Sequence, residues 1–408
     1  MRNIAMITMH SCPAGRLGTR DVGGMNVYVT HVARELAKSG CRVDIYTRSD
    51  RAHGQHVAEI TPFVRVVHVE AGPIDESKDA MSGHVPTFVE AVDGFRREHR
   101  LMYELVHSHY WLSGKAGSEL SKRWGVPHVT MFHTTALTKL LARIGEQEPE
   151  GRVESEREVM AAANAIVVST EQERSDISRL YNSEPAKISV LPAGVDLELF
   201  RPTDKAEARR SLGLPDRNIV LSVGRVEPLK GFDILLQAMA SLDDRSDNMV
   251  VIVGGDEDAS PELERLRELS RSLGLGDDVL FTQAVSQERL SMYYNAADVF
   301  VMPSYYESFG LVALEAMACG VPVIASRVSG PRSFVKSGVT GYLVDRRCPE
   351  PFAQRLDVLL HNPMLRESMG RAARSHAEKL GWDMVGRRTL DVYDSVTLGP
   401  RSASIAAG

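Results

Sequence analysis

Two glutamates, Glu307 and Glu315, are separated by seven residues in a segment typical of a strand end, a loop and a helix start. Phe309, Gly310 and Leu311 begin the expected helix, where backbone N–H groups lack intrahelical partners and the helix dipole favours a diphosphate. A carboxylate that accepts from two hydroxyls suits a sugar or a ribose. The pattern therefore indicates a sugar-diphosphate site. The structural alternatives are a charge at the helix start for Glu307 and a buried, paired carboxylate for Glu315.

This segment resembles the E-x7-E signature of GT-B glycosyltransferases of family 4, and the resemblance extends over nearly the whole chain. The resemblance implies an α/β fold of the GT-B type, with two Rossmann-like domains facing a central cleft. It also implies a retaining enzyme whose nucleotide-sugar donor is held mainly by the C-terminal half. Glu307 is then expected to orient the donor sugar and Glu315 to bind the ribose.

Two cations, Arg225 and Lys230, lie five residues apart after the strand expected at Asn218 to Val223. In the resembled family, these positions hold the donor diphosphate. The chemistry requires such charges, because a departing nucleoside diphosphate gains negative charge in the transition state and fixed cations stabilise it. The alternative is an exposed pair of helix-capping cations.

A glycine loop follows the first expected strand and resembles the family loop that contacts donor phosphate and acceptor together. The resemblance assigns Gly24 to the donor, and Asp21, Gly23 and Asn26 to the acceptor. The run Gly-Gly-Met-Asn-Val-Tyr from Gly23 is similar to the branch that transfers a sugar to inositol phosphate and opens mycothiol synthesis. Sucrose-phosphate synthases carry a related loop, typically with glutamine after the glycines.

Four further positions match the inositol-phosphate branch: Lys78, Tyr110, Thr134 and Arg152. The resemblance implies that they surround the phosphate of the acceptor. A lysine, an arginine and two hydroxyls form a suitable clamp, because charge-assisted hydrogen bonds are the strong ones. The alternatives, one by one, are a solvated lysine, a core tyrosine, a capping threonine and an ion-paired arginine.

Histidines also follow the expected strands. By resemblance, His133 lies near the donor sugar and His10 contacts the acceptor. His107 and His109 alternate on a strand, but no carboxylate or cysteine partner is suitably spaced, so no metal site is predicted. The pattern requires no cofactor beyond the UDP-sugar donor. A magnesium ion on the diphosphate stays open.

Along the sequence, short runs rich in β-branched residues alternate with helical patterns, which is typical of βαβ units around parallel sheets. These strands and helices must position the candidate site residues. We predict an N-terminal acceptor-binding Rossmann-like domain at residues 1–197 and a C-terminal nucleotide-sugar-binding Rossmann-like domain at residues 198–381. A last helix at about residues 382–396 is expected to pack back on the first domain. The expected strands run over Ile4–Met9, Val43–Thr47, Val64–Val69, Glu104–Ser108, Pro127–Phe132, Ala165–Ser169, Ile188–Leu191, Asn218–Val223, Met249–Val253, Val279–Phe281, Val299–Met302, Pro322–Ala325 and Tyr342–Val344.

Composition limits the function classes. The chain has 408 residues, of which 43% are hydrophobic and 25% charged, and a formal net charge of -6. The acidic balance argues against a general nucleic-acid partner, and no apolar run is long enough to span a membrane. The four cysteines are scattered, which fits a reducing compartment, and we expect a cytoplasmic protein with small-molecule partners only. A homodimer stays open.

The predicted reaction moves N-acetylglucosamine or another hexose from a UDP-sugar to a phosphorylated polyol, foremost inositol 3-phosphate. Two departures bear on this: Thr282–Ser286 lacks an arginine expected in that branch, and the region between Ala136 and Arg152 is less similar to it. The alternatives are transfer to fructose 6-phosphate, as in sucrose-phosphate synthase, and a mannosyltransferase with a lipid acceptor. From another class, a dinucleotide-binding protein is disfavoured because G-x-G-x-x-G is missing after either first strand. A regulatory sugar-binding protein without activity is disfavoured because Arg225, Lys230 and Glu307 are all present.

Overall fold

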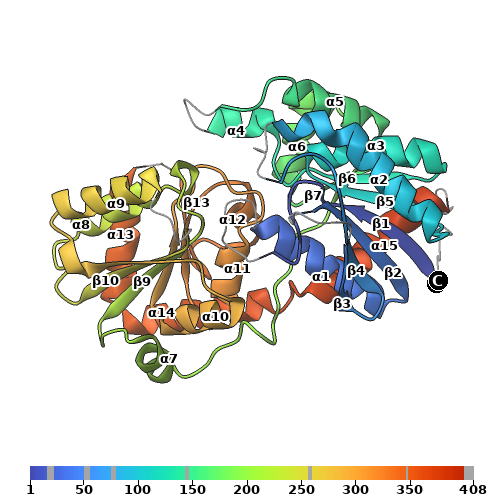
Figure 1. Ribbon diagram of the computed structural model, residues 1–408. Coiled ribbons are helices and arrows are strands. Elements are labelled where there is room, and N and C mark those ends of the chain that lie inside the picture. Colours follow the sequence, from blue (N-terminus) through green and yellow to red (C-terminus); the bar gives the residue numbers. More distant parts are fainter. Residues whose placement is uncertain are drawn as a thin grey trace, which may run out of the picture. The chain divides into compact units, whose positions relative to one another are not determined.

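The computed structural model describes residues 1–15, 23–49, 56–74, 80–142, 147–255, 260–345 and 348–398. The chain divides into two compact units (Figure 1). The N-terminal unit contains the described parts of Met1–Gly15, Gly24–Leu191 and Asp383–Gly408. The C-terminal unit contains Gly23 and the described parts of Pro192–Trp382. None of the described helices is long and apolar enough to cross a membrane.

The N-terminal unit is built on an eight-stranded sheet in the order β3-β4-β2-β1-β5-β6-β7-β8. All neighbouring strands pair in parallel except β3, which is antiparallel to β4 at the edge of the sheet. Apolar runs that are buried on both faces form the inner strands, as expected for a parallel sheet. The strands are β1 (Arg2–Ile7), β2 (Cys41–Arg48), β3 (His56–Thr61), β4 (Val64–Val69), β5 (Leu105–His109), β6 (His128–Met131), β7 (Ala165–Val168) and β8 (Ile188–Val190).

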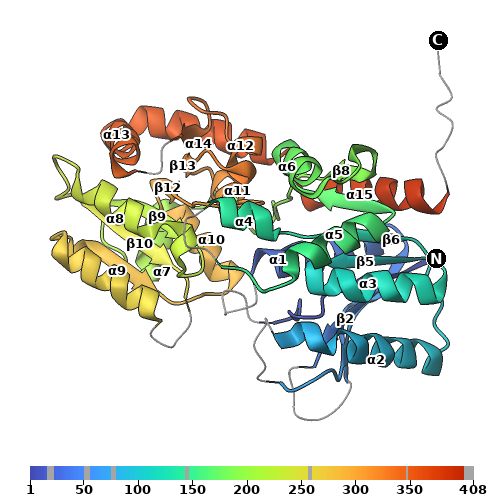
Figure 2. The same ribbon diagram turned by 90° about the horizontal axis from the view of Figure 1, so that it is seen from above.

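Helices cover this sheet, and α2, α3 and α5 pack side by side (Figures 1 and 2). The last helix, α15, packs in the N-terminal unit, because the Tyr393 hydroxyl lies 2.7 Å from His107 Nδ1 of β5. It also lies against α1, since a Cβ at Gly386 would be 2.5 Å from Cβ of Glu35. The helices are α1 (Gly24–Lys38), α2 (Val85–Glu98), α3 (Trp111–Trp124), α4 (Ala136–Ala142), α5 (Arg152–Ala162), α6 (Glu171–Tyr181) and α15 (Trp382–Thr397), with 3-10 turns η1 (Ala80–His84) and η2 (Pro185–Lys187).

The C-terminal unit holds a six-stranded parallel sheet in the order β11-β10-β9-β12-β13-β14. One apolar cluster packs α8, α9 and α13 on the sheet, and another packs α10, α11 and α14. The strands are β9 (Asn218–Val223), β10 (Asn248–Val253), β11 (Val279–Thr282), β12 (Val299–Met302), β13 (Val323–Ser326) and β14 (Gly341–Val344). The helices are α7 (Lys205–Leu212), α8 (Phe232–Ala240), α9 (Pro261–Ser272), α10 (Gln287–Ala296), α11 (Leu311–Ala318), α12 (Ser329–Phe334), α13 (Pro349–Leu360) and α14 (Pro363–Ala377), with η3 (Pro228–Lys230) and η4 (Gly276–Asp278).

Strand order brings the candidate residues together at the carboxyl ends of neighbouring strands. In the C-terminal unit, β9 pairs with β10 on one side and with β12 on the other. The strand order reverses its direction between β9 and β12, so the topological switch point of the sheet lies between these two strands. In the N-terminal unit, β1, β5 and β6 are consecutive neighbours, and each is followed by predicted site residues. Open α/β sheets bind ligands at such carboxyl ends.

Candidate active site

The loops after β9 and β12 form the first group of candidate residues. Lys230 Nζ donates to Glu307 Oε2 at 2.7 Å, and the Tyr305 N–H donates to the Leu229 carbonyl at 2.8 Å. Gly231 allows this approach, because it has a φ of +66° and a Cβ there would lie 2.3 Å from the Pro303 carbonyl oxygen. Two loops that are distant in sequence are thus tied together by an ion pair and backbone contacts.

Glu307 is held as a carboxylate. Burial would raise its pKa, but the charge of Lys230 and the hydrogen bond from it, with a further bond from the Gly310 N–H at 3.3 Å, lower the pKa below its ordinary value. The Lys230 and Glu307 side chains are 19% and 16% exposed. The pair is therefore fixed in position while part of each side chain still reaches solvent.

The start of α11 provides a candidate diphosphate site. Its N-cap residue is Gly310, with a φ of +70° and no side chain to cap the helix. The Gly310 N–H, expected to meet the diphosphate, donates to Glu307 instead, and the Ala313 N–H donates to the Gly310 carbonyl at 3.0 Å. The N–H groups of Leu311 and Val312 are the ones that this helix start can offer to a ligand. The Phe309 and Leu311 side chains are buried and therefore face the protein rather than a ligand. The loop is supported by Gly330, whose N–H donates to the Glu307 carbonyl at 2.8 Å.

The second predicted cation, Arg225, differs from Lys230. Its side chain is 46% exposed, and Nη2 donates to Glu227 Oε1 at 3.1 Å. Exposed pairs of this kind are weak, so the guanidinium can exchange partners at little cost. Arg225 and Lys230 lie on the same loop after β9, one at the surface and one half-buried.

Glu315 lies on α11 in an apolar environment. The Tyr294 hydroxyl donates to its Oε2 at 2.7 Å, and the side chain is buried. Burial raises the pKa of Glu315 to about 7, although the Tyr294 hydrogen bond opposes the shift. Glu307 and Glu315 thus have different partners and opposite pKa shifts. One is a fixed carboxylate and the other titrates near neutral pH.

Four of the predicted acceptor residues form a continuous row in the N-terminal unit. The rings of His10 and Tyr110 lie with centroids 4.3 Å apart, and the Arg152 guanidinium lies 4.9 Å from the Tyr110 ring centroid. Arg152 Nη2 donates to the Thr134 carbonyl at 2.9 Å and to its Oγ1 at 3.3 Å. Two other acceptor candidates, Asp21 and Lys78, lie outside the described residues.

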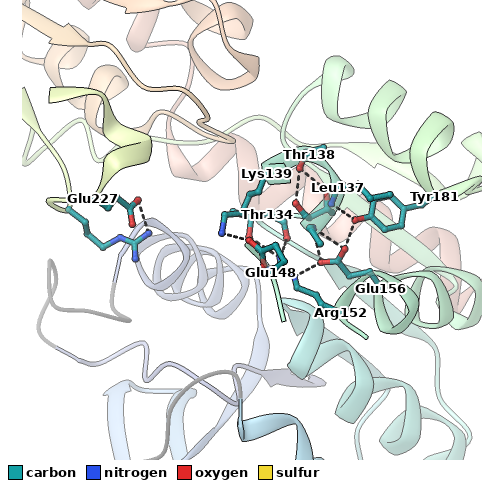
Figure 3. A network of polar contacts seen from close by, with 12 residues as sticks. Thr134, Leu137, Thr138, Lys139, Glu148, Arg152, Glu156, Tyr181 and Glu227 are labelled. Atoms are coloured by element: carbon teal, nitrogen blue, oxygen red, sulfur yellow. Dashed lines mark hydrogen bonds and ion pairs between the residues drawn. The ribbon is translucent and has the colours of Figure 1, made fainter. Parts of the chain in front are cut away.

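Arg152 is enclosed by carboxylates (Figure 3). Its Nε donates to Glu156 Oε1 at 2.8 Å, its Nη1 pairs with Glu148, and the side chain is 2% exposed. Burial alone would lower the pKa of Arg152, but the neighbouring Tyr110, Glu156 and Glu148 outweigh burial and raise it. The arginine is therefore charged, buried and ion-paired, which was one of the alternatives open from the sequence.

His133 lies beside a second histidine. His109 Nδ1 and His133 Nε2 are 2.9 Å apart, and the Tyr28 ring meets the His133 ring edge-on at 5.5 Å between centroids. Burial lowers the pKa of His133 to about 3 and that of His109 well below its usual value. Both rings are therefore neutral at neutral pH. In the described part of the chain, no group of three or more His, Cys, Asp or Glu side chains is arranged to hold a metal ion.

The glycine loop leads into α1, which begins at Gly24 directly after Gly23. Asn26 is buried, and its Nδ2 donates to Ser11 Oγ and to the Cys12 carbonyl, both at 2.8 Å. Its side chain therefore fastens the chain that follows β1. The contacts of Asn26 in the structure are thus with the segment after β1, and its contact with an acceptor stays a prediction.

Several residues of these networks were not predicted from the sequence: Lys139, Glu148, Glu156, Tyr181 and Tyr294. A signal existed for two of them, because Glu148, Arg152 and Glu156 follow one another at intervals of four residues, the spacing of ion pairs on a helix. Tyr294 has no such local signal, since its partner Glu315 is 21 residues away.

The two parallel-sheet units and the loop geometry after β9 and β12 define a GT-B glycosyltransferase. Comparison with known proteins identifies the family. Residues 204–376 match the family model described as glycosyl transferases group 1, and residues 23–194 match the glycosyl transferase 4-like domain. The chain belongs to the family 4 glycosyltransferases and is an enzyme of that group.

Relatives and solved structures agree with this assignment. The chain is 41% identical to D-inositol 3-phosphate glycosyltransferase 2 of Catenulispora acidiphila, covering 96% of this chain and 94% of that one. It is 42% identical to the D-inositol 3-phosphate glycosyltransferase of Acidothermus cellulolyticus, over 99% and 92% of the two chains. Among solved structures, the sucrose-phosphate synthase of Thermosynechococcus elongatus matches with a TM-score of 0.91 and 33% identity, over 98% of this chain and 100% of that one. HepE of Anabaena, solved with UDP and glucose, shares the fold at a TM-score of 0.77 and 18% identity, over 97% and 100% of the chains.

Proposed function

We propose that this enzyme transfers N-acetylglucosamine or a related hexose from a UDP-sugar to inositol 3-phosphate, with retention of the anomeric configuration. The observation that carries the proposal is the row formed by His10, Tyr110, Arg152 and Thr134. A guanidinium next to a hydroxyl is a phosphate-recognising pair. Relatives named D-inositol 3-phosphate glycosyltransferase at 41% identity support this acceptor. The resemblance of the loop from Gly23 to the branch that opens mycothiol synthesis would place the enzyme in that pathway.

The donor side of the proposal rests on the C-terminal unit. Arg225, Lys230 and the start of α11 would stabilise the departing UDP, because each presents positive charge or N–H donors where the diphosphate gains charge. Glu307, held ionised by Lys230, would orient hydroxyls of the sugar, and Glu315 would bind the ribose. The UDP and glucose in the HepE structure support a UDP-sugar donor.

Retention follows from the chemistry of the leaving group in this proposal. The diphosphate oxygen takes the proton of the acceptor hydroxyl on the face from which UDP departs, so the new bond forms on that same face. Neutral His133 would donate to or accept from a hydroxyl of the sugar, and Gly24 would lie next to the phosphate. No protein-held cofactor is proposed, and a magnesium ion on the diphosphate would add to the same charge stabilisation.

A second candidate is sucrose-phosphate synthesis, favoured by the TM-score of 0.91 to the cyanobacterial synthase. Both candidates use a phosphorylated acceptor, so the phosphate-binding row serves either. The sequence after Gly24 distinguishes the two candidate functions, because this chain has Met25 and Asn26 where sucrose-phosphate synthases typically have glutamine. The inositol-phosphate acceptor is therefore favoured.

Release of UDP from several UDP-sugars, measured with each acceptor in parallel, tests the proposal. The acceptors are inositol 3-phosphate, fructose 6-phosphate, free inositol and a phosphatidylinositol vesicle. We expect inositol 3-phosphate to give the highest kcat/KM, by orders of magnitude over free inositol, because free inositol lacks the charged oxygens that would accept hydrogen bonds from the Arg152 guanidinium. Preference for fructose 6-phosphate would move the assignment to sucrose-phosphate synthesis, and equal use of free inositol would refute the phosphate clamp.

A further inference from the structure

Glu148 lies between two cations in the region where the acceptor phosphate is proposed to bind (Figure 3). One of its oxygens, Oε1, pairs with Lys139 Nζ, and the other, Oε2, pairs with Arg152 Nη1. The Glu148 side chain is only 5% exposed. Arg152 also bonds to Thr134, so the carboxylate of Glu148 and the hydroxyl of Thr134 are partners of the same guanidinium. The carboxylate of Glu148 is therefore already paired with the guanidinium of Arg152, which is proposed to bind the acceptor's phosphate.

The second carboxylate on Arg152, Glu156, has a different character. It is bound on several sides: by Arg152 Nε at 2.8 Å, by the Ala136 N–H at 3.0 Å to Oε2, and by the Tyr181 hydroxyl. It lies within α5 and is fully buried. Glu156 thus remains a fixed counter-ion for Arg152 whether or not Glu148 is present.

Glu148, by contrast, lies outside the helices. It precedes α5 in the described segment 147–151, and its hydrogen bonds among the described residues go to Lys139 and Arg152 only. No backbone N–H is bonded to its carboxylate within that part of the chain. Glu148 can therefore be displaced from the two cations without breaking a helix or a strand.

We propose that the carboxylate of Glu148 occupies the binding site of the acceptor's phosphate in the free enzyme, and that the phosphate displaces Glu148 when the acceptor binds. This inference rests on the proposed function, in which Arg152 and Thr134 bind that phosphate. A phosphate has more acceptor oxygens and more charge than a carboxylate, so it can replace both ion pairs of Glu148. A neutral polyol cannot, because displacing Glu148 would remove one of the two carboxylates that neutralise the buried Arg152 and put no negative charge in its place. Glu148 thereby makes the site select for a phosphorylated acceptor.

Replacing the carboxylate by an amide tests the proposal. Glu148→Gln keeps the shape and removes the competing charge, and Glu154→Gln is the matched control, since Glu154 is 66% exposed and its ion pair is with Arg157. Calorimetry with inositol 3-phosphate and, separately, with inorganic phosphate measures the affinity of each variant. If the open site is populated to about a tenth or less in the parent, Glu148→Gln should bind both ligands at least about tenfold more tightly. The control should bind like the parent.

A purely structural role for Glu148 gives the opposite result: the variant would lose thermal stability and bind inositol 3-phosphate and phosphate no better than the parent, which overturns the proposal. If the variant does not fold, a crystal structure of the parent protein with inorganic phosphate decides: we expect phosphate on Arg152 with Glu148 moved away, and Glu148 still paired with Arg152 refutes it. If Glu148→Gln binds phosphate more tightly but the enzyme transfers no sugar to inositol 3-phosphate, the proposal that phosphate displaces Glu148 stands. The proposed acceptor is then refuted instead.

Discussion

Replacing Lys230 by alanine removes the cation that lies 2.7 Å from Glu307 Oε2. At that separation, two unit charges attract by about 6 kcal/mol at an effective dielectric constant of about 20 and by about 1.5 kcal/mol in water. The side chains are 19% and 16% exposed, and the cost of desolvating them offsets most of the attraction. We therefore expect the free energy of unfolding to fall by about 1–3 kcal/mol, and the pKa of Glu307 to rise because burial is no longer opposed.

Turnover should fall further than stability. Loss of one preorganised charge contact costs about two to three powers of ten in kcat, which corresponds to about 3–4 kcal/mol. Arg225→Ala is the matched variant, because its side chain is 46% exposed and its surface pair contributes about 1 kcal/mol or less to stability. We expect Arg225→Ala to lower kcat with little change in the melting temperature.

A double variant separates the two effects of Lys230. Lys230→Ala combined with Glu307→Gln removes the unpaired carboxylate, so thermal denaturation should show part of the lost stability restored. UDP release should stay slow, because the cation for the diphosphate is still missing. Recovery of turnover together with stability, or near-normal turnover in the single Lys230 and Arg225 variants, would refute the assigned role of these cations.

The remaining predictions concern single positions. Glu307→Gln should lower kcat more than it weakens UDP binding in calorimetry, since its carboxylate is assigned to the sugar; a change in UDP affinity alone would contradict this. Glu315→Ala should weaken UDP binding directly, and parent-like affinity would exclude the ribose role. Because burial raises the pKa of Glu315 to about 7, the stability that its protonated form contributes is present below about pH 4.5 and is lost as the pH rises through about 7. Glu315→Gln should therefore raise the melting temperature at about pH 8 but not at about pH 4. A higher melting temperature at about pH 4 would be inconsistent with this pKa shift. Gly310→Ala should lower the melting temperature, because its φ is +70° and a Cβ would lie 3.2 Å from Phe334 Cζ; an unchanged melting temperature would show that the loop adapts. Lys78→Ala should raise the KM of the acceptor and leave the KM of the donor nearly unchanged, and equal changes in both would argue against a phosphate contact.

Most strands were predictable because buried parallel strands are short apolar runs that the sequence displays directly. The run Val299–Met302 is one example, and Asn218–Val223 is another. The edge strand His56–Thr61 was missed. It pairs on one side only, its residues are exposed or partly exposed, and Val57 is 47% exposed, so no apolar run marks it. Its antiparallel pairing with β4 also departs from the predicted all-parallel pattern.

The candidate site was predictable where function depends on position along a strand or a helix. Gly310 is the N-cap of α11, directly before the helix begins at Leu311, and Lys230 and Glu307 follow the strands predicted for them. The ion pair between these two residues was not predicted, because 77 residues separate them and periodicity specifies a face rather than a partner. The same limit hid the Tyr294–Glu315 contact.

The region between Ala136 and Arg152 was the hardest to interpret from sequence. It is less similar to the inositol-phosphate branch, and it contains Lys139 and Glu148. Both residues look like ordinary surface charges in the sequence. The structure shows that Arg152 draws Glu148 into a nearly buried ion pair, because a buried guanidinium requires counter-ions. That requirement becomes visible only when the burial of Arg152 is known.

The most direct test of the account is the product itself. The enzyme is incubated with UDP-N-acetylglucosamine and inositol 3-phosphate, and the isolated product is examined by mass spectrometry and proton NMR. We predict one N-acetylglucosamine residue joined to inositol phosphate, with the small anomeric coupling of the α linkage that was present in the donor. A β linkage, or release of UDP with no sugar attached to inositol phosphate, would contradict retaining transfer to this acceptor.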